Sequence, residues 1–356
     1  MPELQSIRGL AALAVLLHHS SFLFTTSRQF HFYSEALINT HAAVMMFFVL
    51  SGYVLVRSLN GRALTVESCA RFYIARLFRI YPALWSACVI AVAYLVAVHF
   101  RGPILQASEW YKQFFNQFPS IADVAENMVA ANFALVPPTW SVRVELFASA
   151  AIPLICFMAR RGFGLPLLGG SIALAPILAQ QTMHTAGFLI YMPSFILGAL
   201  AFRYQDRLAR MLGKPSALAA SAAVLLFFRL IDPAWRFDSH YNAILPTLIE
   251  SVAAALLIVG IVARPIPLLQ RRLLTRLGDI SYSLYLVHFI VMSGLARLIC
   301  GISINQDIRA VMLMLGTLAV SWPLSAILYS CIEKPGIRIG GILSDRLLGK
   351  LQANPA

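Results

Sequence analysis

Two polar residues of the first apolar segment have the types and spacing expected of catalytic groups inside a membrane. Arg8 opens the segment and His19 follows eleven residues later. In an α-helix this spacing brings both side chains onto one stripe, roughly 16 Å apart along the axis. His19 is then expected near the middle of the bilayer, where burial disfavours the charged imidazole. A neutral imidazole can accept a proton, so His19 is a candidate general base, whereas His18 points to another face.

The second group of candidates is cationic. Arg71, Arg76 and Arg79 occur in the sequence RFYIARLFRIYP. Arg76 and Arg79 are three residues apart and share one helix face. Guanidinium groups clustered in this way suit phosphate binding. The equally open alternative is that these arginines only mark a cytoplasmic loop.

The third group lies in PPTWSVRVELF, at the start of another apolar segment. Its candidate substrate-binding residues are Trp140, Ser141, Arg143 and Glu145. An arginine and a carboxylate that enter hydrocarbon both need partners. Arg143 and Glu145 could pair with each other or could hold a polar substrate, and the sequence leaves both open.

Other polar residues inside apolar segments are candidates for a supporting role: Ser51, Tyr53, His288 and Glu333. Glu250, inside the eighth apolar stretch, is a weaker candidate. Ser51 and Gly52 interrupt the apolar run FFVLSGYVL and permit close helix packing. Glu333 is expected to pair with a cytoplasmic arginine, and His41 is expected at the membrane interface.

The composition indicates which elements must hold these residues. The chain has 356 residues, of which 59% are hydrophobic and 12% charged, whereas soluble domains contain about 25% charged residues. This excludes a cytosolic or secreted enzyme, a disordered chain and a fibrous repeat, and it predicts an all-α, polytopic membrane protein. The formal charge of +13 fits cytoplasmic loops, and no basic run interleaved with aromatics predicts nucleic acid as a partner. The five cysteines have no metal-ligand spacing, so no metal is expected.

About ten apolar stretches are long enough to be considered as spans. They lie near 9–26, 36–58, 81–100, 142–159, 163–180, 186–204, 215–231, 242–263, 279–299 and 308–332. If the N-terminus is cytoplasmic, the inside segments hold 20 of the 28 basic residues, which predicts that both termini are cytoplasmic. Residues 121–138 are too polar to span and are expected to be interfacial or re-entrant. The prediction is one transmembrane domain over 1–335 and a short cytoplasmic tail over 336–356.

Six segments, taken in order, resemble acyltransferase family 3, the bacterial membrane O-acyltransferases that modify glycans, lipids and some small molecules. They are RGLAALAVLLHH, FFVLSGYVL, RLFRIYPALW, TWSVRVELFAS, ISYSLYLVHF and IEKP. The resemblance implies acyl-CoA as the donor, His19 as the essential catalytic group with Arg8, and a role for Arg76 and Arg79. Many members carry an acidic residue where this chain has Met45. A step that uses that carboxylate would be absent here or carried by Glu145.

The resemblance therefore implies an inner-membrane enzyme that transfers an acyl group, acetyl being favoured, to a hydroxyl of an extracytoplasmic or lipid-linked glycan. A base at mid-membrane allows a cytoplasmic donor and an outer acceptor to meet there. Direct transfer and a relay through an acylated His19 both fit. A transporter or flippase of a polar lipid or glycan is the alternative class, although the sequence lacks an inverted repeat. The unrelated membrane-bound O-acyltransferase family would instead use His288 and leave Arg8 and His19 without a role.

Overall fold

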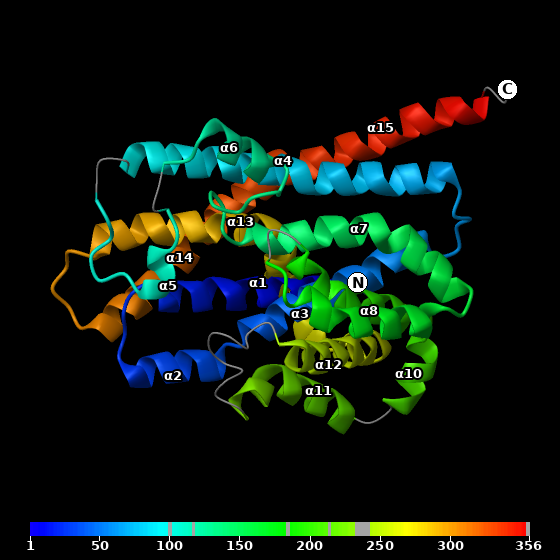
Figure 1. The fold of residues 1–356 in the computed structure, drawn as a ribbon, viewed down its shortest axis with the longest axis horizontal. Helices are drawn as coiled ribbons and strands as arrows, with labels where there is room; N and C mark the ends of the chain where they lie inside the picture. The colour runs from blue at the N-terminus through cyan, green and yellow to red at the C-terminus, as the bar shows by residue number, and fades with distance from the viewer. Residues whose placement is uncertain (99–101, 116–117, 183–185, 213–214, 232–242, 354–356) are drawn as a thin grey trace. The chain divides into compact units, whose positions relative to one another are not determined.

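The computed structural model describes residues 1–98, 102–115, 118–182, 186–212, 215–231 and 243–353, and their regular structure is helical throughout (Figure 1). One isolated antiparallel bridge, between Phe24 and Ala107, is the exception within these ranges. The predicted all-α fold class is confirmed for the described residues.

A helix coincides with each of the ten predicted spans. These helices are α1 (Pro2–Phe22), α3 (Thr40–Leu59), α4 (Val66–Val98), α7 (Thr139–Arg160), α8 (Gly164–Leu178), α9 (Met192–Arg203), α11 (Pro215–Phe227), α12 (Ile244–Ala263), α13 (Arg272–Ile299) and α14 (Gln306–Leu328). The other helical elements are α2 (Arg28–Leu37), α5 (Glu109–Lys112), α6 (Ile121–Met128), η1 (Gly187–Tyr191), α10 (Gln205–Met211), η2 (Phe228–Leu230), η5 (Pro267–Gln270), the π-helical turn η6 (Tyr329–Glu333) and α15 (Lys334–Ala353).

Six stretches of the described chain are long and apolar enough to cross a membrane. They are Arg28–Leu59, Val66–Val98, Thr139–Arg160, Ile244–Ala263, Arg272–Ile299 and Gln306–Leu347. A seventh results if Gly187–Arg203 and Gln205–Met211, which meet at 83°, form one span. Helix α1 is not among the six, and α8 and Pro215–Leu230 are shorter apolar helices. The protein therefore has several helices that could cross a membrane, while ten spans and cytoplasmic termini stay predictions.

The chain forms two compact units, which are described in turn. The first unit contains Met1–Ala11, Asn39–Tyr73 and Val144–Gly278. The second contains Ala12–Ile38, Ile74–Arg143 and Asp279–Ala356. Helices α1, α4, α7 and α13 each contribute residues to both units.

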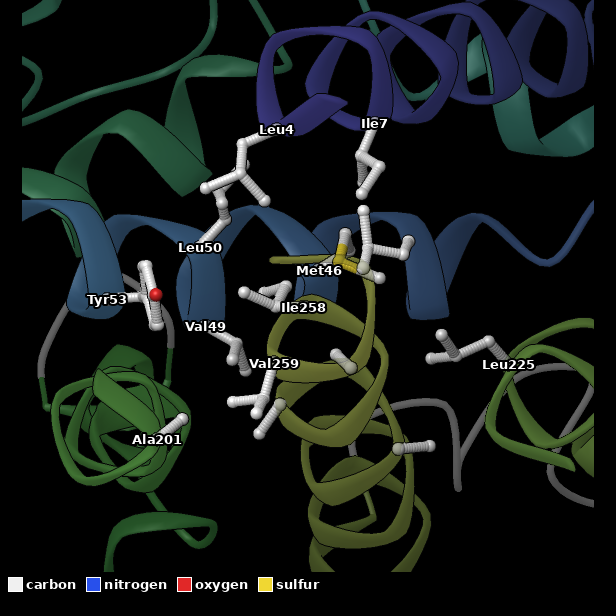
Figure 2. Packing of buried hydrophobic residues seen from close by; sticks show 14 of the residues in the cluster. Leu4, Ile7, Met46, Val49, Leu50, Tyr53, Ala201, Leu225, Ile258 and Val259 are labelled. Carbon is white, nitrogen blue, oxygen red and sulfur yellow. The ribbon is translucent and has the colours of Figure 1, made fainter. Parts of the chain in front are cut away.

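The core of the first unit forms where α3 packs against α9 and α12. Figure 2 shows Leu4, Met46, Val49 and Ile258 meeting in this cluster. A Cβ atom on Gly52 would overlap the backbone of α9, and one on Gly198 would overlap the backbone of α3. Only glycine permits this approach, so the close packing predicted at Ser51-Gly52 is confirmed.

The second unit holds its irregular segment 102–115 against the end of α1. The backbone N–H of Ser108 donates to Leu23 O at 2.8 Å, and that of Thr25 donates to Gln106 O at 3.1 Å. The Ser108 hydroxyl also donates to Phe22 O at 2.6 Å. These contacts place α5 beside a buried cluster that contains Phe24, Tyr111 and Phe289.

The polar segment 121–138 begins with α6, which is eight residues long and too short to span a bilayer. Ser120 and Asp123 form a capping box at its start. The Ser120 hydrogen bonds hold the pKa of the Asp123 carboxyl below its usual range. After the helix, the buried Asn127 side chain accepts a hydrogen bond from Leu135 N at 3.1 Å. The segment is therefore internally braced, and its position in the membrane stays a prediction.

The predicted tail is helical over its described part. Helix α15 packs on α4, because a Cβ atom on Gly336 would meet Pro82 and one on Gly340 would meet Phe78 within 3 Å. The last three residues of the predicted tail, 354–356, lie outside the described residues.

Candidate active site

Helices α1 and α13 pack closely at two glycines, Gly9 and Gly278. A Cβ atom on Gly9 would lie 2.6 Å from the backbone nitrogen of Gly278. The guanidinium of Arg8 donates to Gly278 O at 2.7 Å. Gly9 and Gly278 are 269 residues apart, and the same separation joins His19 to His288. The glycine pair belongs to the first unit, and the histidine pair belongs to the second.

The imidazoles of His19 and His288 form the central contact of the candidate site. His19 Nδ1 lies 2.9 Å from His288 Nε2. His288 is fully buried, and its Nδ1 lies 2.9 Å from Tyr285 O and 3.2 Å from Leu284 O. The two rings are stacked, with centroids 5.2 Å apart.

The hydrogen-bond partners assign the protons of this pair. Carbonyl oxygens only accept, so the proton of a neutral His288 lies on Nδ1 and its Nε2 carries a lone pair. His19 must then donate through Nδ1–H, which leaves the lone pair on His19 Nε2. That nitrogen makes no hydrogen bond with any described residue. His19 is therefore held in the tautomer that a general base requires.

Aromatic rings surround this base. The His19 ring lies 5.4 Å from the Trp110 ring and 5.9 Å from the Phe289 ring, measured between centroids. His18 belongs to a different environment, as its predicted face requires, and stacks on Phe22 at 4.2 Å. His18 Nδ1 is buried and makes no hydrogen bond with a described residue.

The segment ISYSLYLVHF on α13 links three other helical segments to the site. Tyr282 donates to Ile80 O of α4 at 3.0 Å. Tyr285 shares a hydrogen bond of 2.8 Å with Ser141 of α7. Ser283 donates to the buried carboxylate of Glu333 at 2.9 Å. Ser141 and Glu333 are thus brought to the helix of His288, while an arginine partner for Glu333 stays a prediction.

The three arginines of α4 differ in their surroundings. Arg71 pairs with Glu67 one turn earlier, with Nη2 and Oε1 3.1 Å apart. Arg76 and Arg79 are half-buried and share one face of the helix. Arg79 makes no hydrogen bond or ion pair with a residue in the described ranges. Arg79 is therefore the cation of this group best able to receive a phosphate.

The remaining residues of TWSVRVELFAS point in different directions. Arg143 donates to Ala131 O at 3.2 Å, and Glu145 accepts a bond of 3.5 Å from Ser51. Two residues on a helix are separated by 200°, so Arg143 and Glu145 do not face each other. Trp140 is half-buried at the first turn of α7. Of the four, Ser141 has a hydrogen bond to the helix of His288, at Tyr285.

Tyr53, predicted as a supporting residue, has a contact within the first unit. Its hydroxyl donates to the side chain of Gln205 at 2.6 Å, and its ring is fully buried. A groove of about 500 Å³ also lies in this unit, between α11 and α12. Apolar side chains such as Val224 and Leu248 line it, and it contains no predicted site residue. We therefore assign no reacting group to the groove.

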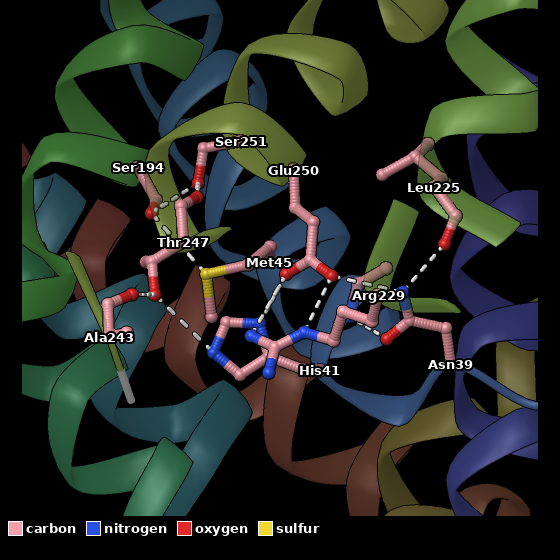
Figure 3. A network of polar contacts seen from close by, with 11 residues as sticks. Asn39, His41, Met45, Ser194, Leu225, Arg229, Ala243, Thr247, Glu250 and Ser251 are labelled. Atoms are coloured by element: carbon pink, nitrogen blue, oxygen red, sulfur yellow. Dashed lines mark hydrogen bonds and ion pairs between the residues drawn. The ribbon is translucent and has the colours of Figure 1, made fainter. Parts of the chain in front are cut away.

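The sequence reasoning missed a buried ionic network in the first unit, drawn in Figure 3. Glu250 pairs with His41 and accepts from Arg229 Nε at 2.9 Å. Asn39 also donates to Glu250, at 2.9 Å. His41 is 1% exposed, so the expectation that it simply faces the interface does not describe its environment. Ionisable residues in separate apolar segments need partners, and this signal could have linked Glu250 with Arg229.

Met45, which occupies the family's acidic position, lies beside this network (Figure 3). It is fully buried, and its sulfur accepts a weak hydrogen bond from the Ser194 hydroxyl at 3.6 Å. Ser194 in turn contacts the Ser251 hydroxyl at 2.8 Å. A thioether there supplies neither charge nor a proton. Among the described residues, no group of three or more His, Cys, Asp or Glu could hold a metal ion.

Comparison with known proteins identifies the family. The family model described as an acyltransferase domain matches residues 1–326. The chain belongs to acyltransferase family 3. A curated relative, Acyltransferase MdmB of Streptomyces mycarofaciens, is 24% identical over 385 residues, covering 96% of this chain and 92% of the relative. No solved structure gives a significant match.

Family membership and the apolar helices make the protein a membrane acyltransferase. The resemblance to this family is thereby confirmed; the match includes five of the six segments, and IEKP lies beyond residue 326. The match does not support the alternative membrane-bound O-acyltransferase family, in which His288 rather than His19 would react. Donor, acceptor and the roles of individual residues belong to the proposal that follows.

Proposed function

We propose that this enzyme transfers an acyl group, acetyl being favoured, from cytoplasmic acyl-CoA to a hydroxyl of an extracytoplasmic or lipid-linked glycan. The observation that carries the proposal is the contact between His19 and His288. It leaves a basic nitrogen, His19 Nε2, that makes no hydrogen bond with any described residue, on a ring that lies beside Trp110 and Phe289. A hydroxyl is a substrate that such a nitrogen can activate.

In the proposed reaction, the acceptor hydroxyl gives its proton to His19 Nε2 while its oxygen attacks the thioester carbonyl carbon. The carbon–sulfur bond then breaks, and the departing thiolate of CoA receives the proton from His19. His288 Nε2 accepts from His19 Nδ1–H throughout and stabilises the imidazolium that forms between the two steps. The same His19 lone pair could carry the acyl group in a relay, and this would show as a labelled enzyme intermediate.

We assign the phosphates of CoA to Arg76 and Arg79. Their shared face gives two adjacent guanidinium groups, a geometry suited to phosphate oxygens. Arg71 completes the predicted cluster, but its charge is shared with Glu67. Arg8 donates to a helix carbonyl, so we assign it a positioning role for the crossing of α1 and α13.

The membrane placement belongs to the same proposal. We infer a multi-pass protein of the bacterial inner membrane, with ten spans and cytoplasmic termini, from the distribution of basic residues. CoA is too polar to cross the bilayer. A base part-way along α1 would allow donor and acceptor to approach from opposite faces.

The test uses purified protein in detergent and acetyl-CoA labelled in the acetyl group. Binding of labelled acetyl-CoA is measured by gel filtration at equilibrium, and turnover is measured by release of free CoA. We expect saturable binding in both the wild type and His19→Ala, with turnover lost in the variant. His18→Ala is the matched control, because it removes the neighbouring imidazole, which faces elsewhere, and it should keep turnover.

Two results would contradict the proposal. Near-normal turnover in His19→Ala would show that His19 is not the general base. If the protein bound none of acetyl-, propionyl-, succinyl- and palmitoyl-CoA saturably, acyl-CoA would not be the donor. Label captured in membrane vesicles that resists neutral hydroxylamine and is released by alkaline hydroxylamine would identify an oxygen ester and hence a hydroxyl acceptor.

A further inference from the structure

We propose that Trp110 shields His19 from water, so that the enzyme passes its acyl group to an acceptor hydroxyl and does not hydrolyse acyl-CoA. This inference rests on the proposed function and adds a residue that sets the choice between two oxygen nucleophiles. Water is the commonest competitor of any hydroxyl at a general base. An enzyme whose base is held ready for use needs a means to exclude water.

The position of the Trp110 ring supports this role. It lies over His19 with centroids 5.4 Å apart and a tilt of 36°. Its ring centroid also lies 5.9 Å from that of Phe289 and 5.3 Å from that of Phe114, so aromatic rings line one side of the His19 imidazole. Trp110 itself is only half-buried, and part of its ring is therefore open to an incoming molecule.

The backbone that carries Trp110 is held in place by the end of the helix that carries His19. Ser108 caps α5 by accepting from Tyr111 N, and the same hydroxyl donates to Phe22 O at 2.6 Å. Ser108 N donates to Leu23 O at 2.8 Å. Three hydrogen bonds thus fix the residues next to Trp110; one of them ends on Phe22 of α1 and another on Leu23, the residue that follows this helix.

The same segment stores backbone strain on both sides of Trp110. Gln106 has a φ of 60° and Phe115 a φ of 57°, a region that side chains other than glycine rarely adopt. Such residues gather at ligand clamps and active sites. Here the two strained residues flank α5, the short helix that carries Trp110 beside His19.

The reaction that Trp110 would suppress is the hydrolysis of acyl-CoA. A water molecule gives one proton to His19 Nε2, its oxygen bonds to the thioester carbon, and the carbon–sulfur bond breaks. The thiolate then takes the proton from His19, giving acetate and CoA. The step needs the same base as transfer, so it should depend on His19.

The experiment measures labelled acetate released from acetyl-CoA without added acceptor. Trp110→Ala should release acetate several-fold faster than the wild type, whereas Trp110→Phe, which keeps an aromatic ring, should stay near the wild type. Trp110→Ala combined with His19→Ala should lose the extra release. Trp85→Ala is the matched control, because that ring contacts Tyr81 and its indole donates to Met128 O.

Each outcome decides between the claims. If Trp110→Ala binds acetyl-CoA and releases acetate at the wild-type rate, the shielding role is wrong while the proposed function stands. If the wild type binds no acyl-CoA, the proposed function itself fails. If Trp110→Ala does not fold, Ser108→Ala replaces it. That variant loosens α5 without changing the ring, and unchanged acetate release would then overturn the inference.

Discussion

Replacing His288 offers the sharpest test of the assigned tautomer. In His288→Ala, the Nδ1–H of His19 loses its acceptor inside the protein. A buried donor without a partner costs about 1–3 kcal/mol. Since 1.36 kcal/mol is a factor of ten in rate, kcat should fall about 5- to 150-fold. The KM for acyl-CoA should change little, because no donor contact is assigned to His288.

The conservative variant separates orientation from packing. His288→Gln supplies an amide oxygen that can accept from His19, so it should recover a large part of the lost kcat. Loss of the base itself, in His19→Ala, should cost about 10²- to 10⁴-fold. The double variant should be no slower than His19→Ala alone, because the two rings act as a unit.

The assay is initial-rate release of CoA from purified protein, with melting temperature as the check on folding and His18→Ala as the control. Multiplicative losses in the double variant would refute the reasoning, because they would mean that His288 acts independently of His19. A raised KM with an unchanged kcat for His288→Ala would also refute it.

Three further predictions concern residues elsewhere in the structure. Arg79→Ala should raise the KM for acetyl-CoA with little change in kcat, and should discriminate less against dephospho-CoA, as competition binding would show. Glu250→Gln should destabilise the protein by roughly 3–5 kcal/mol, because the buried Arg229 loses its counter-charge; a thermal melt in detergent measures this, and an unchanged melt would contradict it. Gly9→Ala should lower both melting temperature and turnover, because its Cβ would meet backbone on α13, whereas Gly341→Ala, with nothing within 4 Å, should be neutral.

The local part of the site could be predicted from sequence because helix periodicity is a local property. The spacing of Arg8 and His19 fixes their shared stripe on α1, whatever packs against it. The apolar composition likewise determines the helical class, since unpaired backbone groups are too costly in hydrocarbon. Arg71 and Glu67 are four residues apart on one helix, so their ion pair could also be predicted from the sequence.

Only the tertiary structure decided which distant groups meet. His19 and His288 are separated by 269 residues, and so are Gly9 and Gly278, whose backbones approach closely. The partner of Glu250 was hidden for the same reason, since Arg229 sits on another element. Contacts between helices depend on backbone approach and rotation, which no single segment encodes. The sequence by itself therefore determined the position of His19 on α1, and the packing of α13 decided which group accepts the hydrogen bond from its Nδ1–H.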